Sequence, residues 1–90
     1  MGELRQFRAR QLAQLLRLRE ELVAKYPERE ERINFLVDLL AVKLHNLRRY
    51  TLADYLFTLH LASKEFSEFA ALIPKDPKDV ERLLEGEEGE

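Results

Sequence analysis

Apolar residues recur every three or four positions along most of the chain, the spacing that gathers them on one side of an α-helix. Three prolines interrupt this pattern, at Pro27, Pro74 and Pro77. A proline disfavours helical backbone in the residue before it and fits the first turn of the next helix, so these positions predict helix boundaries. The pattern therefore predicts an all-α fold. The predicted helices cover roughly residues 3–25, 27–50, 51–73 and 77–85.

Residues that cap helix ends support these boundaries. Thr51 is a candidate N-cap with Asp54 three positions later. Asp76 is a candidate N-cap of the last helix, with Asp79 three positions later. The connections between the three long helices are short, which is typical of antiparallel neighbours in a compact bundle. We therefore expect one domain over residues 1–85. The acidic tail, residues 86–90, has no apolar residue to bury and is predicted to be disordered.

The predicted helix 27–50 is apolar around most of its circumference. One stripe, of the kind that packs into a core, contains Ile33, Leu36, Val37, Leu40, Leu44 and Leu47. A second regular stripe contains Phe35, Leu39, Val42 and Tyr50. A helix with apolar residues on several sides is usually surrounded by other elements, whereas in a three-helix bundle it contacts only two neighbours. One side is therefore predicted to stay uncovered within a single chain.

The predicted helix 51–73 has a similar surplus of apolar residues. Its core stripe is ordinary, but three large apolar residues lie on the opposite side among charged ones. The predicted protein interface consists of Phe35, Leu39, Val42, Phe57, Leu61 and Leu72. Burying one exposed Leu or Phe stabilises an assembly by roughly 1.5–3 kcal/mol, so we expect a homodimer or association with another protein subunit. The alternative is that these residues are isolated apolar groups on an ordinary surface.

Composition narrows the class of protein. Of the 90 residues, 46% are hydrophobic and 36% are charged, which is typical of a globular domain rather than of a disordered chain or a membrane protein. The longest apolar stretch, 52–62, is much shorter than the roughly 18 residues of a membrane span. There is no cysteine, which fits a cytoplasmic protein. Abundant Glu and Arg with few Asn and Gln are also compatible with a thermophilic source.

The charges are distributed unevenly, although the formal net charge is only −2. Residues 1–50 carry 11 Lys and Arg against 7 Asp and Glu, and residues 51–90 carry 4 against 10. Five arginines in the first helix have no acidic residue between them: Arg5, Arg8, Arg10, Arg17 and Arg19. They could contact nucleic-acid phosphates, so a small nucleic-acid-binding regulator is the alternative function. We favour contact with acidic protein surfaces, because the net charge is negative.

No pattern of catalytic or ligand-binding residues stands out. His45 and His60 are the only histidines. Asp38 lies seven positions before His45, about 10 Å along a helix, so the two cannot hydrogen-bond within it. The glycines lie near the chain ends and form no phosphate-binding loop, and no histidine–carboxylate spacing predicts a metal site. We therefore expect no catalytic residue, cofactor or metal, and a non-catalytic interaction or adaptor module that recognises helix faces.

One local segment resembles a helix-turn-helix, a DNA-binding motif. Residues 50–56 resemble its first helix, and residues 63–68 stand where its recognition helix would begin. The resemblance implies a turn near His60 and a second helix that contacts DNA. The expected turn glycine is missing, however, and Glu65 and Glu68 would repel phosphates. A continuous helix explains the same residues.

Overall fold

The structure, a computed structural model, describes residues 3–47 and 49–89. Within these residues the fold is all-α, as the sequence predicts, with four α-helices and two short 3₁₀-helices and no strand. The α-helices are α1 (Glu3–Lys25), α2 (Glu30–His45), α3 (Leu52–Glu65) and α4 (Pro77–Gly89). The 3₁₀-helices are η1 (Pro27–Arg29), between α1 and α2, and η2 (Ser67–Leu72), after α3.

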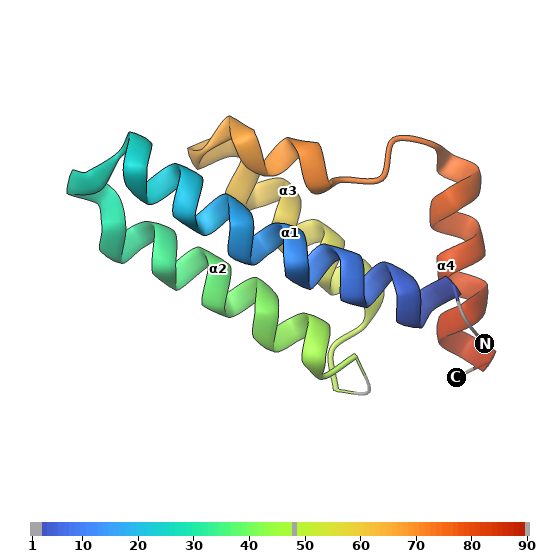
Figure 1. Ribbon diagram of the computed structural model, residues 1–90. Helices are drawn as coiled ribbons and strands as arrows, with labels where there is room; N and C mark the ends of the chain where they lie inside the picture. The colour runs from blue at the N-terminus through green and yellow to red at the C-terminus, as the bar shows by residue number, and fades with distance from the viewer. Residues whose placement is uncertain (1–2, 48, 90) are drawn as a thin grey trace.

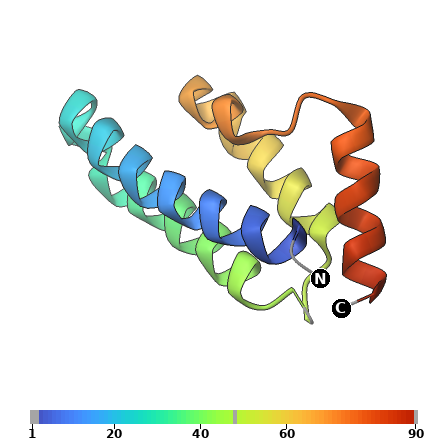
Figure 2. The same cartoon turned by 45° about the vertical axis from the view of Figure 1, so that its right-hand side comes forward.

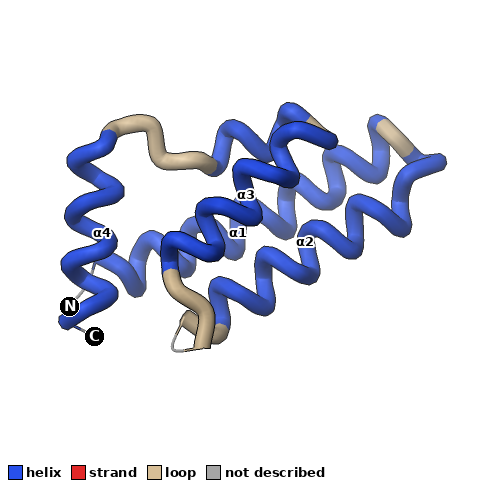
Figure 3. Tube along the Cα trace, turned by 180° about the vertical axis from the view of Figure 1, so that it is seen from behind, coloured by secondary structure: helices blue, strands red, loops and turns tan. Residues whose placement is uncertain are grey.

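Three of the α-helices run alternately up and down. The chain reverses at η1, so α1 and α2 lie side by side and antiparallel (Figure 1). α4 lies steeply across the ends of the other helices, next to the start of α1 (Figure 2). Seen from behind, α3 returns antiparallel to α2 and lies next to it (Figure 3). One face of the α2–α3 pair is therefore turned away from α1.

A single cluster of buried apolar side chains lies between the helices. It includes most of the predicted core-facing stripe of α2. The buried residues of this stripe are Ile33, Leu36, Val37, Leu40 and Leu44. The stripe on α3 is buried in the same way, with Leu52, Tyr55, Leu59 and Ala62. The helical spacing of apolar residues thus identified the core sides of both helices correctly.

The carboxyl-terminal ends of α2 and α4 differ from the predicted ones. α2 ends at His45 rather than near Tyr50, because the backbone of Asn46 leaves the helical angles (φ −119°, ψ 50°). Position 48, within the predicted helix, lies outside the described residues. α4 continues to Gly89, four residues past its predicted end and over most of the tail that was expected to be disordered. Glu90 lies outside the described residues. The predicted cap at Thr51 is confirmed, since its hydroxyl accepts from the N–H of Asp54 at 3.0 Å.

The helix predicted over 51–73 is not continuous. α3 ends at Glu65, and Phe66 adopts extended backbone angles (φ −133°, ψ 104°) before the chain continues as η2. The break turns the ring of Phe66 toward those of Tyr26 and Phe69, whose centroids lie 5.6 and 6.4 Å away. Contacts among aromatic rings therefore take the place of further helical turns.

The helix-turn-helix interpretation is wrong. α3 is continuous through His60, where that motif needs a turn. The residues expected to begin a recognition helix are the last turn of α3 and the start of η2, a 3₁₀-helix of 6 residues.

Leu72 was predicted to lie in the interface, but it is buried, with only 6% of its surface exposed. The prediction assumed a continuous helix, in which Leu72 would follow Phe57 and Leu61 on one side. In a 3₁₀-helix, residues three positions apart share a side, so Phe69 and Leu72 both face the core. Leu72 therefore belongs to the core and not to an interface.

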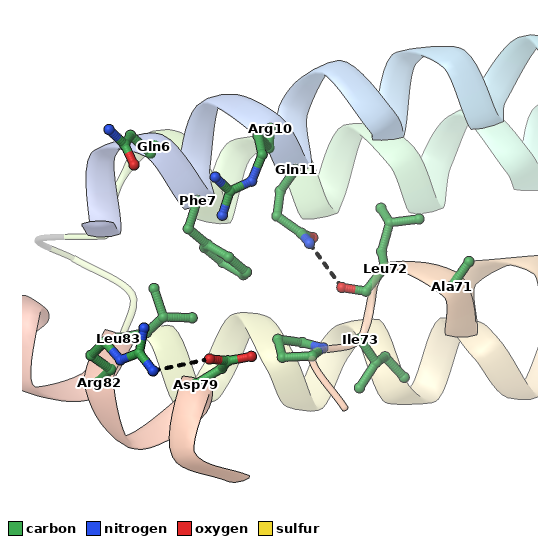
Figure 4. A pocket seen from close by; sticks show the side chains of 11 residues that line it. Gln6, Phe7, Arg10, Gln11, Ala71, Leu72, Ile73, Asp79, Arg82 and Leu83 are labelled. Atoms are coloured by element: carbon green, nitrogen blue, oxygen red, sulfur yellow. Dashed lines mark hydrogen bonds and ion pairs between the residues drawn. The ribbon is translucent and has the colours of Figure 1, made fainter. Parts of the chain in front are cut away.

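Gln11 is the polar residue that joins α1 to both α3 and η2. Its side chain is buried, its Nε2 donates to the backbone oxygen of Leu72 at 2.8 Å, and its Oε1 accepts from the hydroxyl of Tyr55. Figure 4 shows the first of these hydrogen bonds. Burial raises the pKa of the Tyr55 hydroxyl, which therefore stays protonated and remains a donor. The Tyr55 ring also meets Phe7 edge-on, with centroids 6.5 Å apart.

Replacing Gln11 with leucine should destabilise the protein, because the Leu72 oxygen and the Tyr55 hydroxyl would stay buried without a partner. Each unpaired group costs about 1–3 kcal/mol, so we expect Gln11→Leu to lower the free energy of unfolding, measured by urea titration, by about 2–4 kcal/mol. Gln14→Leu, at an exposed position of the same helix, is the control and should change it by less than about 0.5 kcal/mol. Equal effects of the two substitutions would contradict this role of Gln11.

Candidate protein interface

An uncovered apolar surface runs along α2 and α3. On α2, Phe35 and Val42 are 53% and 47% exposed, and on α3, Phe57 and Leu61 are 62% and 46% exposed. Leu39 lies between the two α2 residues and is half-buried. We call these five residues the α2–α3 apolar strip. It contains five of the six residues that the sequence predicted for an interface.

The side chains of the strip lie on the same side of the helix pair. Residues 35, 39 and 42 are separated by four and three positions and residues 57 and 61 by four, so each set shares one side of its helix. The two helices also match in burial. From position 33 to 43, nearly every residue of α2 is buried to the same degree as the residue 22 positions later in α3. Phe35 thus corresponds to Phe57 and Leu39 to Leu61, and both sets face away from the core.

Two ion pairs join α2 to α3 at the ends of the strip. The guanidinium group of Arg32 donates to both carboxylate oxygens of Glu65, at 2.9 and 2.7 Å. The ammonium group of Lys43, about three turns further along α2, donates to Asp54 at 2.8 Å. α2 supplies the cation and α3 the anion in both pairs. They align the antiparallel helices so that residue 32 is level with residue 65 and residue 43 with residue 54.

Hydrogen bonds from cations lower the pKa of two carboxyl groups near one end of the strip. The hydrogen bond from Arg32 lowers the pKa of Glu65, and the hydrogen bond from Lys25 lowers that of Glu68. The guanidinium carbon of Arg32 also lies 5.3 Å from the ring centroid of Phe35, within cation–π range. The strip therefore has an apolar centre and a charged end whose charges are paired.

The five arginines of α1 do not form one surface. Arg5, Arg10 and Arg17 are exposed, and Arg8 and Arg19 are half-buried. Arg10 and Arg17 line grooves beside η2, whereas Arg19 lines the groove between α1 and α2. They therefore lie on different sides of the helix, and the structure does not gather them along a single edge that could follow a nucleic-acid backbone.

A pocket of about 440 Å³ lies between the start of α1, the segment after η2 and α4 (Figure 4). Gln6, Arg10 and Arg82 are among its polar side chains. Asp79 is the single carboxylate among its lining residues, and it lies 3.4 Å from Arg82. The pocket therefore presents no nucleophile paired with a general base, the arrangement on which nucleophilic catalysis depends.

The histidines are exposed and lie on different helices, His45 at the end of α2 and His60 within α3. In the part of the chain that the structure describes, no three His, Asp or Glu side chains come together as ligands for a metal ion. Nor does any helix there combine the length and the apolar character needed to cross a bilayer.

The role of Gln11 was not predicted from the sequence. A signal for it exists, because Gln11 lies four positions after Phe7 and four before Leu15, both of which are buried. A polar residue within an apolar stripe predicts a buried hydrogen bond. Its partners could not be identified this way, because Leu72 lies 61 positions away in the sequence.

Comparisons with known proteins assign no function to this surface. No family model matches the chain, and neither a curated protein nor a solved structure matches it. The interpretation of the interface therefore rests on the geometry described above.

Acid should weaken the attachment of α3 and η2 to the rest of the bundle. Because their partners lower the pKa values of Glu65 and Glu68, each carboxylate stabilises the fold above its unfolded pKa of about 4.3. That stabilisation is lost as the pH falls through the lower folded pKa. The midpoint of urea unfolding should therefore fall between about pH 5 and pH 3. Glu65→Gln/Glu68→Gln should lower the midpoint at neutral pH and reduce its fall in acid; a fall as large as that of the wild type would contradict this assignment.

Proposed function

We propose that this protein is a non-catalytic helical interaction module that associates with a second copy of itself through the α2–α3 apolar strip. The observation that carries the proposal is the grouping of large exposed apolar side chains on one side of a helix pair. Single exposed apolar residues are common on soluble monomers, whereas grouped ones usually mark an interaction site. The absence of cysteine supports a cytoplasmic setting for such a module.

The arrangement of the strip also fits an interface. The apolar residues lie in the middle, and the pairs Arg32–Glu65 and Lys43–Asp54 lie at the two ends. An apolar centre with a polar rim is the usual anatomy of a protein–protein interface. The charges of these two pairs already have partners within the chain, so a second copy need not supply partners for them.

The proposed dimer is weak. Burying a fully exposed Leu or Phe contributes roughly 1.5–3 kcal/mol, and the strip residues are already about half-buried. Their remaining burial is offset in part by the translational and rotational freedom lost on association. We therefore expect a dissociation constant in the micromolar range or weaker, so the association must be measured as a function of concentration.

Removing the apolar groups of α3 from the strip should prevent the association. Light scattering or sedimentation equilibrium should show the wild-type mass rising from 10.7 kDa toward that of two chains as the concentration is raised. Phe57→Ser/Leu61→Ser should raise the dissociation constant by at least about tenfold. Both residues are exposed, so the fold should survive, and circular dichroism checks that it does.

Leu16→Ser is the matched control. Leu16 is 46% exposed, as Leu61 is, but it lies on α1, outside the strip. This variant should associate as the wild type does. A wild-type chain that remains a monomer at every concentration, or a Leu16→Ser variant as defective as the double variant, would contradict the proposal.

The alternative function is nucleic-acid binding. A filter-binding measurement distinguishes it from the proposed protein–protein interaction. Because the α1 arginines lie on different sides of the helix, we expect no retention of duplex or single-stranded nucleic acid even at low salt. Retention at low salt that is lost steeply as salt rises would support the alternative, because binding to phosphates depends strongly on ionic strength.

A further inference from the structure

The charges beside the α2–α3 apolar strip indicate how the second copy is placed. We infer that two copies pack strip against strip about a two-fold axis parallel to the helices, with α2 of each copy lying over α3 of the other. This inference rests on the proposed function, since it takes a second copy of the chain as the partner. Neighbouring helices are then antiparallel throughout, as in an up-and-down four-helix bundle.

The alignment between the copies follows from the alignment within one copy. A two-fold axis parallel to the helices leaves the height of each residue along them unchanged. The ion pairs place residue 32 level with 65 and residue 43 level with 54, and the same correspondence then holds from copy to copy. Leu39 lies nearly level with Phe57 of the second copy, and Phe35 with Leu61. Each aromatic ring of the strip therefore meets a leucine.

Exposed polar side chains lie along the outer edges of the strip. The carboxylates Glu31 and Asp38 lie on α2, and the ammonium group of Lys64 and the imidazole of His60 lie on α3. Within the described residues none of them forms an ion pair. When α2 lies over α3 of the other copy, Asp38 is level with His60 and Glu31 is within one turn of Lys64. The acidic edge of one copy thus meets the edge of the other that carries the cation Lys64 and an imidazole able to form a hydrogen bond, which favours this association.

The other way to stack the strips uses an axis at right angles to the helices, which places α2 over α2 and α3 over α3. With that axis through the middle of the strip, Asp38 faces Asp38 of the second copy. Like charges opposite each other across an interface oppose association. The charges therefore select the axis parallel to the helices.

The absence of cysteine from the sequence allows a direct test by thiol cross-linking. In Asp38→Cys/His60→Cys the two thiols of one chain lie on the far edges of neighbouring helices, so the strip separates them. In the inferred dimer each thiol faces a thiol of the other copy. A short bismaleimide should therefore convert the double variant into covalent dimers, and it should leave Asp38→Cys alone and His60→Cys alone unlinked. Glu31→Cys/Lys64→Cys keeps the central charges and should give the same result as the first double variant.

Each outcome of the cross-linking experiment has a definite meaning. Efficient linking of Asp38→Cys alone would overturn the inferred axis in favour of the perpendicular one. If neither double variant is linked at concentrations where the wild-type mass is that of two chains, the inferred geometry is wrong and the proposed self-association stands. A wild-type mass of one chain at every concentration would remove both.

Charge reversal gives an independent measurement. Glu31→Lys should raise the dissociation constant by about threefold or more, because it exchanges an attraction to Lys64 of the other copy for a repulsion. Adding Lys64→Glu to the same chain should restore most of the affinity. Glu81→Lys, the equivalent change of charge at an exposed position of α4, is the control and should leave the affinity unchanged. Failure of Lys64→Glu to rescue Glu31→Lys would contradict the pairing.

Discussion

The hydrogen bonds of Gln11 are the constraint on which the arrangement of the helices depends. η2 ends with Leu72, whose backbone oxygen is buried and has no helical partner, and a buried carbonyl oxygen needs a donor. Gln11 supplies that donor from α1 and uses the other end of its amide to accept from Tyr55 on α3. One side chain therefore holds three segments together. If α1 moved away from either η2 or α3, a buried polar group would lose its hydrogen-bond partner.

The position of η2 in turn determines which residues remain at the surface. Because the helix breaks at Phe66, Phe69 and Leu72 turn into the core, so that only Phe57 and Leu61 of the three α3-side residues expected at the surface lie there. The break also ends α3 at Glu65, where the carboxylate meets Arg32. The burial of Leu72 and the ion pair at the end of the strip are thus two results of the same change in backbone direction.

α2 and α3 share two properties on which the proposed self-association rests. Each helix has one apolar stripe in the core and a second at the surface, and their burial agrees at nearly every equivalent position. Their outer edges, however, carry charges of opposite sign, with Asp38 on α2 and Lys64 on α3. We propose a second copy of the chain as the partner because the two halves of this surface are similar in shape and complementary in charge. The arginines of α1 lack such an arrangement, because they lie on different sides of their helix.

The sequence alone determined the all-α fold, the core sides of α2 and α3, the cap at Thr51 and five of the six residues expected at the surface. These features depend on helical periodicity and on hydrogen bonds between residues a few positions apart, which are properties of any short segment. Only the tertiary structure decided the break at Phe66, the burial of Leu72 and the role of Gln11. Each of these depends on contacts between distant parts of the chain, such as the hydrogen bond between residues 61 positions apart. A periodic pattern records which side of a helix is apolar, but not where an aromatic ring or a buried amide on another helix will stabilise its end.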